Sequence, residues 1–135
     1  MRLTFRLAAA LCGLTLAVTT SAAPRFDDIV VSDSSDGDAV DSFDPGVAKI
    51  FLHAHMLDIP NGAKMKGTWI AVDTHGVAPA NYAIDSAEMT ASGSVNVVNY
   101  SLSKPNNGWP VGHYRVDLSI DGKPSASAEF DIAKD

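Results

Sequence analysis

After residue 22, apolar and polar residues alternate along most of the chain with a period of two, whereas a helix would repeat every 3.6 residues. In the clearest case, residues 113–120, one face is wholly apolar: Tyr114, Val116, Leu118 and Ile120. Further strands are predicted at residues 26–31, 47–59, 64–73, 94–103 and 125–132. A weaker alternation at 82–91 is interpreted as a strand too. The pattern predicts an all-β fold of about seven strands.

Turn residues separate these segments at short intervals. Pro60-Asn61-Gly62 ends one strand, Asp121-Gly122 is a hairpin signal, and residues 74–81 and 104–112 read as loops. Short strands at this spacing are typical of a β-sandwich. Its main body is expected over residues 47–135, preceded by residues 23–46, a short strand and an acidic flexible segment.

The first 22 residues have the pattern of a secretory signal peptide. Arg2 and Arg6 precede an uncharged run from Leu7 to Val18, which is too short to span a bilayer, and small residues follow it. Cleavage is expected after Ala22, because cleavage one residue later would leave Pro24 at the new terminus. A periplasmic or secreted protein is therefore predicted, without a transmembrane segment after cleavage.

Cysteine usage and length limit the mature chain to one domain held together by its core. The only cysteine, Cys12, lies in the leader and follows Leu11 instead of a small residue, so it does not resemble a lipid-attachment site. Loss of 22 residues from 135 leaves 113, without cysteine and hence without disulfides. A single hydrophobic core must then stabilise the fold unaided.

The charge of the chain argues against nucleic-acid binding. Removal of Arg2 and Arg6 with the leader changes the formal charge from −6 to −8, and a phosphate backbone would be repelled. Seven aspartates between Arg25 and Lys49 contribute most of this negative charge. Carboxylates in the stretch from Asp33 to Asp44 are candidate calcium ligands, but their spacing fits no known loop, and a solvated acidic segment is the preferred interpretation.

Three aromatic residues point to a particular kind of sandwich. Trp69 lies in the third strand among apolar neighbours, as the core tryptophan of immunoglobulin-like domains does. Tyr114 opens the penultimate strand, where such domains carry a tyrosine corner. Trp109 is expected to pack over the end of the sandwich beside the turn shaped by Pro110 and Gly112.

The stretch Gly108-Trp109-Pro110-Val111-Gly112-His113-Tyr114-Arg115-Val116, of the form Gly-Trp-Pro-x-Gly-x-Tyr-x-Val, resembles a group of small bacterial exported proteins and lipoproteins. The resemblance covers roughly residues 43–132. It implies a cysteine-free immunoglobulin-like domain outside the cytoplasm and brings no catalytic residue with it. The chain departs from the lipoprotein members because it lacks a lipidation cysteine.

The candidate metal ligands are histidines. His53 and His55 are two residues apart on one strand and therefore share a face, and His75 in a loop is a possible third ligand for copper or zinc. The preferred interpretation is that they are solvent-facing strand residues without a ligand role, since no spacing fixes the third ligand. His113 is expected on the other sheet.

No motif for catalysis is present, because the chain has neither Gly-x-Ser-x-Gly nor His-Glu-x-x-His. The leading hypothesis is an exported, non-enzymatic, immunoglobulin-like domain without a cofactor, acting as a protein-binding or accessory module. It would use a sheet face or the loops 74–81 and 104–112. Outward-facing apolar residues are Phe51 and Leu57 on one sheet and Ile70 and Val72 on the other, and a joined patch of Ile70 and Val72 would indicate a protein partner or a dimer interface. A periplasmic metal-binding protein is the first alternative, and a small hydrolase the second.

Overall fold

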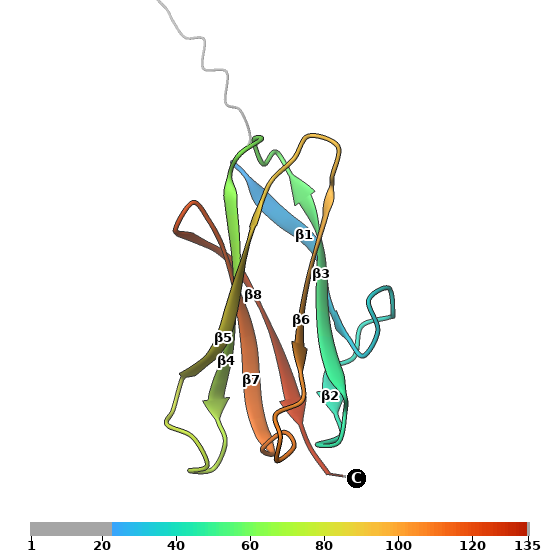
Figure 1. Cartoon of the computed structure of the whole chain (residues 1–135), viewed down its shortest axis with the longest axis vertical. Helices are drawn as coiled ribbons and strands as arrows, with labels where there is room; N and C mark the ends of the chain where they lie inside the picture. Colours follow the sequence, from blue (N-terminus) through green and yellow to red (C-terminus); the bar gives the residue numbers. More distant parts are fainter. Residues whose placement is uncertain (1–22, 135) are drawn as a thin grey trace, which may run out of the picture.

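The computed structural model describes residues 23–134, which form eight strands and no helix (Figure 1). The strands are β1 (Arg25–Ser32), β2 (Ser42–Phe43), β3 (Lys49–Leu57), β4 (Lys64–Asp73), β5 (Tyr82–Thr90), β6 (Val97–Ser103), β7 (Gly112–Ile120) and β8 (Lys123–Ile132). Within this range nothing helical is available to cross a membrane. The predicted leader, its cleavage site and Cys12 lie outside the described residues.

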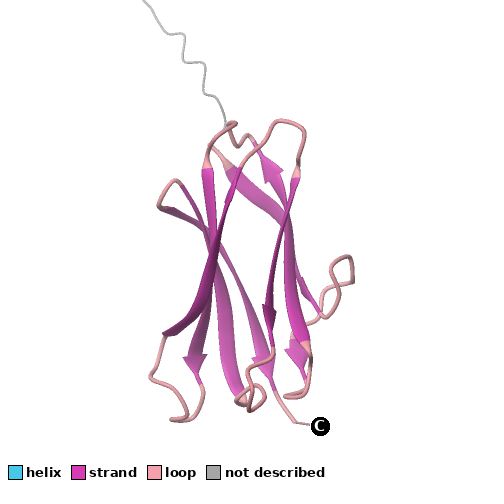
Figure 2. Cartoon of the chain, in the orientation of Figure 1, coloured by secondary structure: helices cyan, strands magenta, loops and turns pink. Residues whose placement is uncertain are grey.

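The strands form two sheets of unequal width, joined by loops at both ends (Figure 2). One sheet has three strands in the order β1-β3-β6, and the other has five in the order β2-β8-β7-β4-β5. Every pairing is antiparallel except that of β2 with β8. The predicted all-β sandwich is therefore confirmed.

The alternation in the sequence identifies the inner faces correctly. On β7, the side chains of Tyr114, Val116, Leu118 and Ile120 are all buried, as predicted. The weakly alternating segment is indeed a strand, β5. The additional strand is β2, two residues in a segment expected to be a loop, where Phe43 is buried in the core.

Aromatic rings around Phe130 form the centre of the core. The Phe130 ring stacks on Tyr114 at 5.3 Å between centroids and meets Trp69 and Phe43 edge to face at 6.2 and 5.6 Å. Trp69, on β4, is 2% exposed. Edge-to-face and offset pairs of this kind add stability beyond the area that they bury. The cluster thus joins three strands of the wide sheet, β2, β4 and β7, through β8.

Two buried tyrosines tie the layers and the loops together. The Tyr114 hydroxyl donates a hydrogen bond to the carbonyl of Pro110, four residues upstream, at 2.6 Å, which is the geometry of a tyrosine corner. The Tyr100 hydroxyl crosses from the narrow sheet to the carbonyl of Met65 at 2.9 Å. Its ring lies over Gly67, where a Cβ would come within 3.0 Å of it. Burial raises the pKa of each tyrosine to about 12.

The loop before β7 is fixed by its tryptophan and glycine. The Trp109 indole is buried, packs edge to face on Tyr114, and donates from Nε1 to the carbonyl of Val47 at 3.0 Å. At Gly112 the backbone has a φ of 158°, and a Cβ would lie 2.1 Å from the carbonyl oxygen of Asp73. The chain can pass this close to β4 only because residue 112 has no side chain.

Ile70 and Val72 do not form an outward apolar patch, so the sheet surface that such a patch would have indicated is absent here. Ile70 is only 9% exposed and Val72 is half-buried. Ile70 lies opposite Arg115 in the register with β7, where the aliphatic part of a long side chain can cover it. The exposed large apolar residues of the described chain lie elsewhere: Val77, Tyr82, Met89 and Val95.

We predict that Trp69→Ala costs about 3 to 5 kcal/mol of unfolding free energy, because it leaves a cavity beside Phe130. Urea denaturation followed by circular dichroism measures this. Trp69→Phe, which keeps a ring in place, should lose clearly less. A Trp69→Ala midpoint close to that of the wild type would show that the indole is not central to the core.

Candidate functional site

The predicted metal ligands on β3 share a face but have different surroundings. His55 is exposed, and its Nδ1 lies 3.0 Å from the Oδ2 of Asp28, which is on the neighbouring strand β1. His53 is half-buried, and its Nδ1 is covered without a hydrogen-bond partner. Both residues are on the three-stranded sheet.

His75 does not join them. It follows β4 in the five-stranded sheet and lines a hollow with Asp73, His113 and Asp131. Across residues 23–134, no three His, Cys, Asp or Glu side chains are grouped so that they could hold a metal ion. The structure therefore brings His53 and His55 together and places His75 at a different site.

His113 lies between two carboxylates on the surface of the wide sheet. Its Nδ1 lies 2.7 Å from the Oδ1 of Asp131 and its Nε2 lies 2.5 Å from the Oε1 of Glu129, both on β8. Hydrogen bonds to Asp131 first and Glu129 second raise the pKa of the imidazole above its usual 6.5. Both ring nitrogens thus face a carboxylate, an arrangement that favours the protonated form of the imidazole.

An apolar hollow of about 340 Å³ lies between the β4–β5 loop (residues 74–81) and the β6–β7 loop (residues 104–111). We call it the loop-end hollow; its two loops are at the lower end of the sandwich in Figure 1. Ala71, Trp109 and Tyr114, all buried, line its inner part. Val77 and Tyr82 also line it, although they are 72% and 49% exposed. An apolar hollow with exposed apolar groups around it suits ligand contact.

The β4–β5 loop is held in one conformation by its own polar groups. The hydroxyl of Thr74 is buried and accepts a hydrogen bond from the backbone N–H of Ala78 at 2.8 Å. The side-chain oxygen of Asn81 accepts from Nη1 of Arg115 at 3.0 Å. Since a loop that is ordered beforehand loses less entropy on binding, this side of the hollow is suited to recognition.

The side chains that line the loop-end hollow are suited to binding and include few reactive groups. The lining contains no carboxylate, imidazole, amine or thiol. Tyr114, its buried phenol, already donates to Pro110, and its raised pKa keeps it protonated at neutral pH. Polar groups at the edge come from the amides of Asn106 and Asn107. Such a site can take an apolar group but cannot perform acid–base or nucleophilic catalysis by itself.

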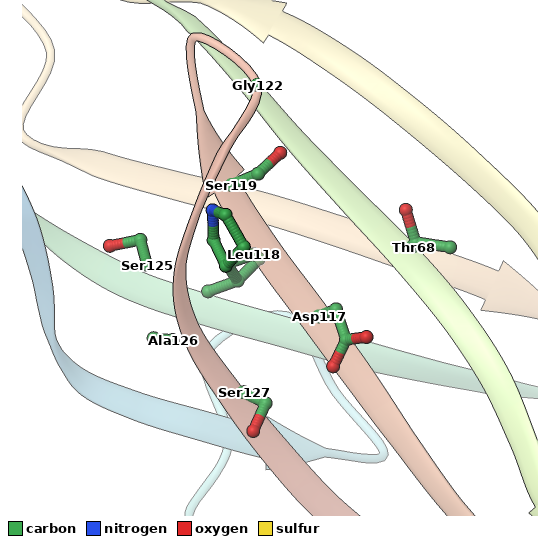
Figure 3. Close-up of a pocket in the computed structure, with 9 residues that line it drawn as sticks. Thr68, Asp117, Leu118, Ser119, Gly122, Ser125, Ala126 and Ser127 are labelled. Atoms are coloured by element: carbon green, nitrogen blue, oxygen red, sulfur yellow. The ribbon is translucent and has the colours of Figure 1, made fainter.

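A second, larger hollow of about 500 Å³ lies on the β7–β8 hairpin and is lined by hydroxyl groups. Figure 3 shows Ser119, Ser125 and Ser127 around the hairpin and Thr68 on β4. The one carboxylate, Asp117, already accepts from Nε of Arg115 at 3.0 and 3.2 Å. This hollow therefore carries no uncompensated charge and no aromatic surface.

The two loops of the loop-end hollow were predicted from the sequence, but its two exposed apolar residues were not. Val77 and Tyr82 were not singled out, because Val77 stands alone in a loop and Tyr82 lies in the strand with the weakest alternation. The only available signal was Val77 itself, a large apolar residue among Gly, Ala and Pro in a loop that shows neither helical nor strand periodicity. Singly exposed apolar residues are common, so this signal alone could not identify a binding site.

His113 makes stability pH-dependent in a defined direction. Its pKa is higher in the folded protein than in the unfolded chain, so its contribution is complete below about pH 6.5 and is lost as the pH rises through the folded-state value. Urea denaturation at about pH 6 and about pH 9 should show a larger difference between wild type and His113→Gln at the lower pH. Asp131→Asn with Glu129→Gln should remove that pH dependence. Equal differences at both pH values would contradict the assignment.

Comparisons with known proteins reveal similarity in fold. No family model matches the chain, and no curated protein matches it. Among solved structures, an immunoglobulin-like protein from Pseudomonas aeruginosa superimposes with a TM-score of 0.59 at 12% identity, over 83% of this chain and 98% of that one.

A second solved structure is the alkylpurine DNA glycosylase AlkC of Pseudomonas fluorescens bound to DNA containing an abasic site analog. It gives a TM-score of 0.50 at 14% identity, over 81% of this chain but only 30% of that chain. At these identities the likeness concerns the fold alone. The chain has an immunoglobulin-like β-sandwich fold.

Proposed function

We propose that this chain is an exported, non-enzymatic, immunoglobulin-like domain that binds a protein partner through the loop-end hollow. The observation that carries the proposal is the exposure of Val77 and Tyr82 beside a hollow whose inner part is lined by the buried Ala71, Trp109 and Tyr114. Exposing these side chains has a cost in water that contact with a partner would remove. Export is inferred from the leader-like pattern of residues 1–22.

The chemistry of the lining favours a protein over a small substrate. A tyrosine at half exposure is typical of the anchors that carry binding energy at protein interfaces. The amides of Asn106 and Asn107 supply hydrogen bonds at the edge, where interfaces are usually polar. A net charge of −6 makes nucleic acid an unfavourable ligand.

Site-specific photo-crosslinking in the native bacterium tests this proposal. A benzophenone amino acid at Val77 or Tyr82 should give one discrete adduct with a periplasmic or secreted protein. The same probe at Ser125, in the hydroxyl-lined hollow, is the matched control and should not give it. With the partner purified, Val77→Ser combined with Tyr82→Ser should weaken binding by about tenfold or more, since hot-spot residues cost over 1 kcal/mol each.

Each part of the proposal can fail separately. Identical adducts at Ser125, or none at Val77 and Tyr82, would exclude the loop-end hollow as the binding site. An uncut precursor that stays inside the cell would contradict export. Because both substituted residues are exposed, the melting temperature of the double variant should stay close to that of the wild type, which separates lost binding from lost folding.

A further inference from the structure

All four exposed large apolar residues of the described chain lie along one flank of the sandwich, between β5 and β6. Val77 and Tyr82 line the loop-end hollow near the start of β5. Met89 and Val95 line another hollow, of about 260 Å³, near the end of β5. We call this second one the methionine hollow, because Met56, Met65 and Met89 all line it. β5 connects the two hollows.

β5 is the last strand of the wide sheet and pairs only with β4, so one of its edges has no partner strand. At its end, the N–H of Ala91 donates to the carbonyl of Ala63 at 2.8 Å. Since backbone groups alternate in direction along a strand, the N–H and C=O groups of Glu88 and Thr90 turn to the unpaired edge. Such an edge is a template for another strand.

The first half of this edge is already blocked. Ile84 is an extra residue between the pairs Trp69–Asp85 and Ile70–Ala83, and this bulge interrupts the ladder. The Oδ1 of Asp85 accepts the N–H of Ser86 at 2.8 Å. The segment that remains open is therefore residues 87–90, directly beside the methionine hollow.

The charge of the flank selects the occupant. From residue 74 to residue 103 the only charged side chains are Asp85 and Glu88, with no lysine or arginine. Pairing two copies of this chain through residues 87–90 would bring their two Glu88 carboxylates to one interface, and like charges across strands are destabilising. Lys66 lies opposite Glu88 in the register, yet no ion pair joins these two residues. The Nζ of Lys64 already donates to the Oγ1 of Thr90 at 3.0 Å, so Glu88 is the charged group of the open segment that a Lys or Arg of an added strand would complement.

We propose that the partner binds by adding an extended strand to residues 87–90 of β5, with apolar side chains toward the methionine hollow and Lys or Arg beside Glu88. This inference rests on the proposed protein-binding function and names the chemistry of the partner. The added strand must alternate apolar and basic residues, because Met89 and Glu88 of β5 face opposite sides of the sheet. Methionine suits the role, since its flexible thioether adapts to different apolar groups.

A designed probe tests the strand addition without knowledge of the natural partner. The probe is a fluorescein-labelled peptide of about ten residues that alternates Lys and Val, matched in length to β5. Fluorescence anisotropy should show saturable binding, and amide shifts in nuclear magnetic resonance should fall on residues 87–90. An alternating Glu and Val peptide should not bind.

Two controls separate backbone pairing from charge attraction. The same Lys–Val peptide with N-methyl groups on alternate residues keeps its charge but loses donors, and it should bind at least about tenfold more weakly. Glu88→Pro should lower affinity similarly, whereas Glu88→Gln should lower it less and reduce the salt dependence. Proline is tolerated at Glu88, because its N–H faces away from β4, so the melting temperature should stay near that of the wild type.

Equal binding by a peptide with separate Lys and Val blocks, or by the N-methylated peptide, would overturn the strand addition. So would a concentration-dependent dimer in sedimentation velocity that protects β5, because the occupant would then be a second copy. If these results appear while the adducts at Val77 and Tyr82 persist, the strand inference fails and the proposed function stands. Loss of the adducts as well would remove both.

Discussion

Five strands on one side of the core face only three on the other, and this inequality determines both the stability and the open surface of the molecule. The three-stranded sheet cannot cover the whole inner face of its partner. On the side of β2, β8 and β7, the aromatic cluster around Phe130 fills the space between the two sheets. Toward β5 nothing equivalent exists among the described residues, and the exposed apolar side chains gather there.

Because the described residues contain no cysteine, the sandwich is held together by packed aromatic rings and by the hydrogen bonds of tyrosine hydroxyls. An antibody domain joins its sheets by a disulfide, whereas here the Tyr100 hydroxyl reaches from one sheet to the carbonyl of Met65 on the other. Trp109 and Tyr114 fasten the β6–β7 loop to the core through Val47 and Pro110. These bonds also hold the inner part of the loop-end hollow in place.

The strands could be predicted from the sequence, but the pairing of strands within each sheet and the residues of the binding site could not. Alternation is a local property, so the inner face of β7 could be predicted from four residues. β2 could not, since two residues show no period and Phe43 is placed by Phe130, far along the chain. The alternation of apolar and polar residues placed Ile70 on the outer face of its sheet, yet its side chain is almost fully buried. Val77, Tyr82, Met89 and Val95 are exposed because of which strands end each sheet, and only topology reveals that.

The central claim is that β5 ends the wide sheet with an unpaired edge, and amide hydrogen exchange of the free protein at low concentration tests it most directly. In the second half of β5, Ala87 and Met89 should be protected by β4, whereas Glu88 and Thr90 should exchange fast. The amides of β7, paired on both sides, should be the slowest. Uniform protection from residue 87 to residue 90 would mean that something already covers this edge, and it would contradict the account.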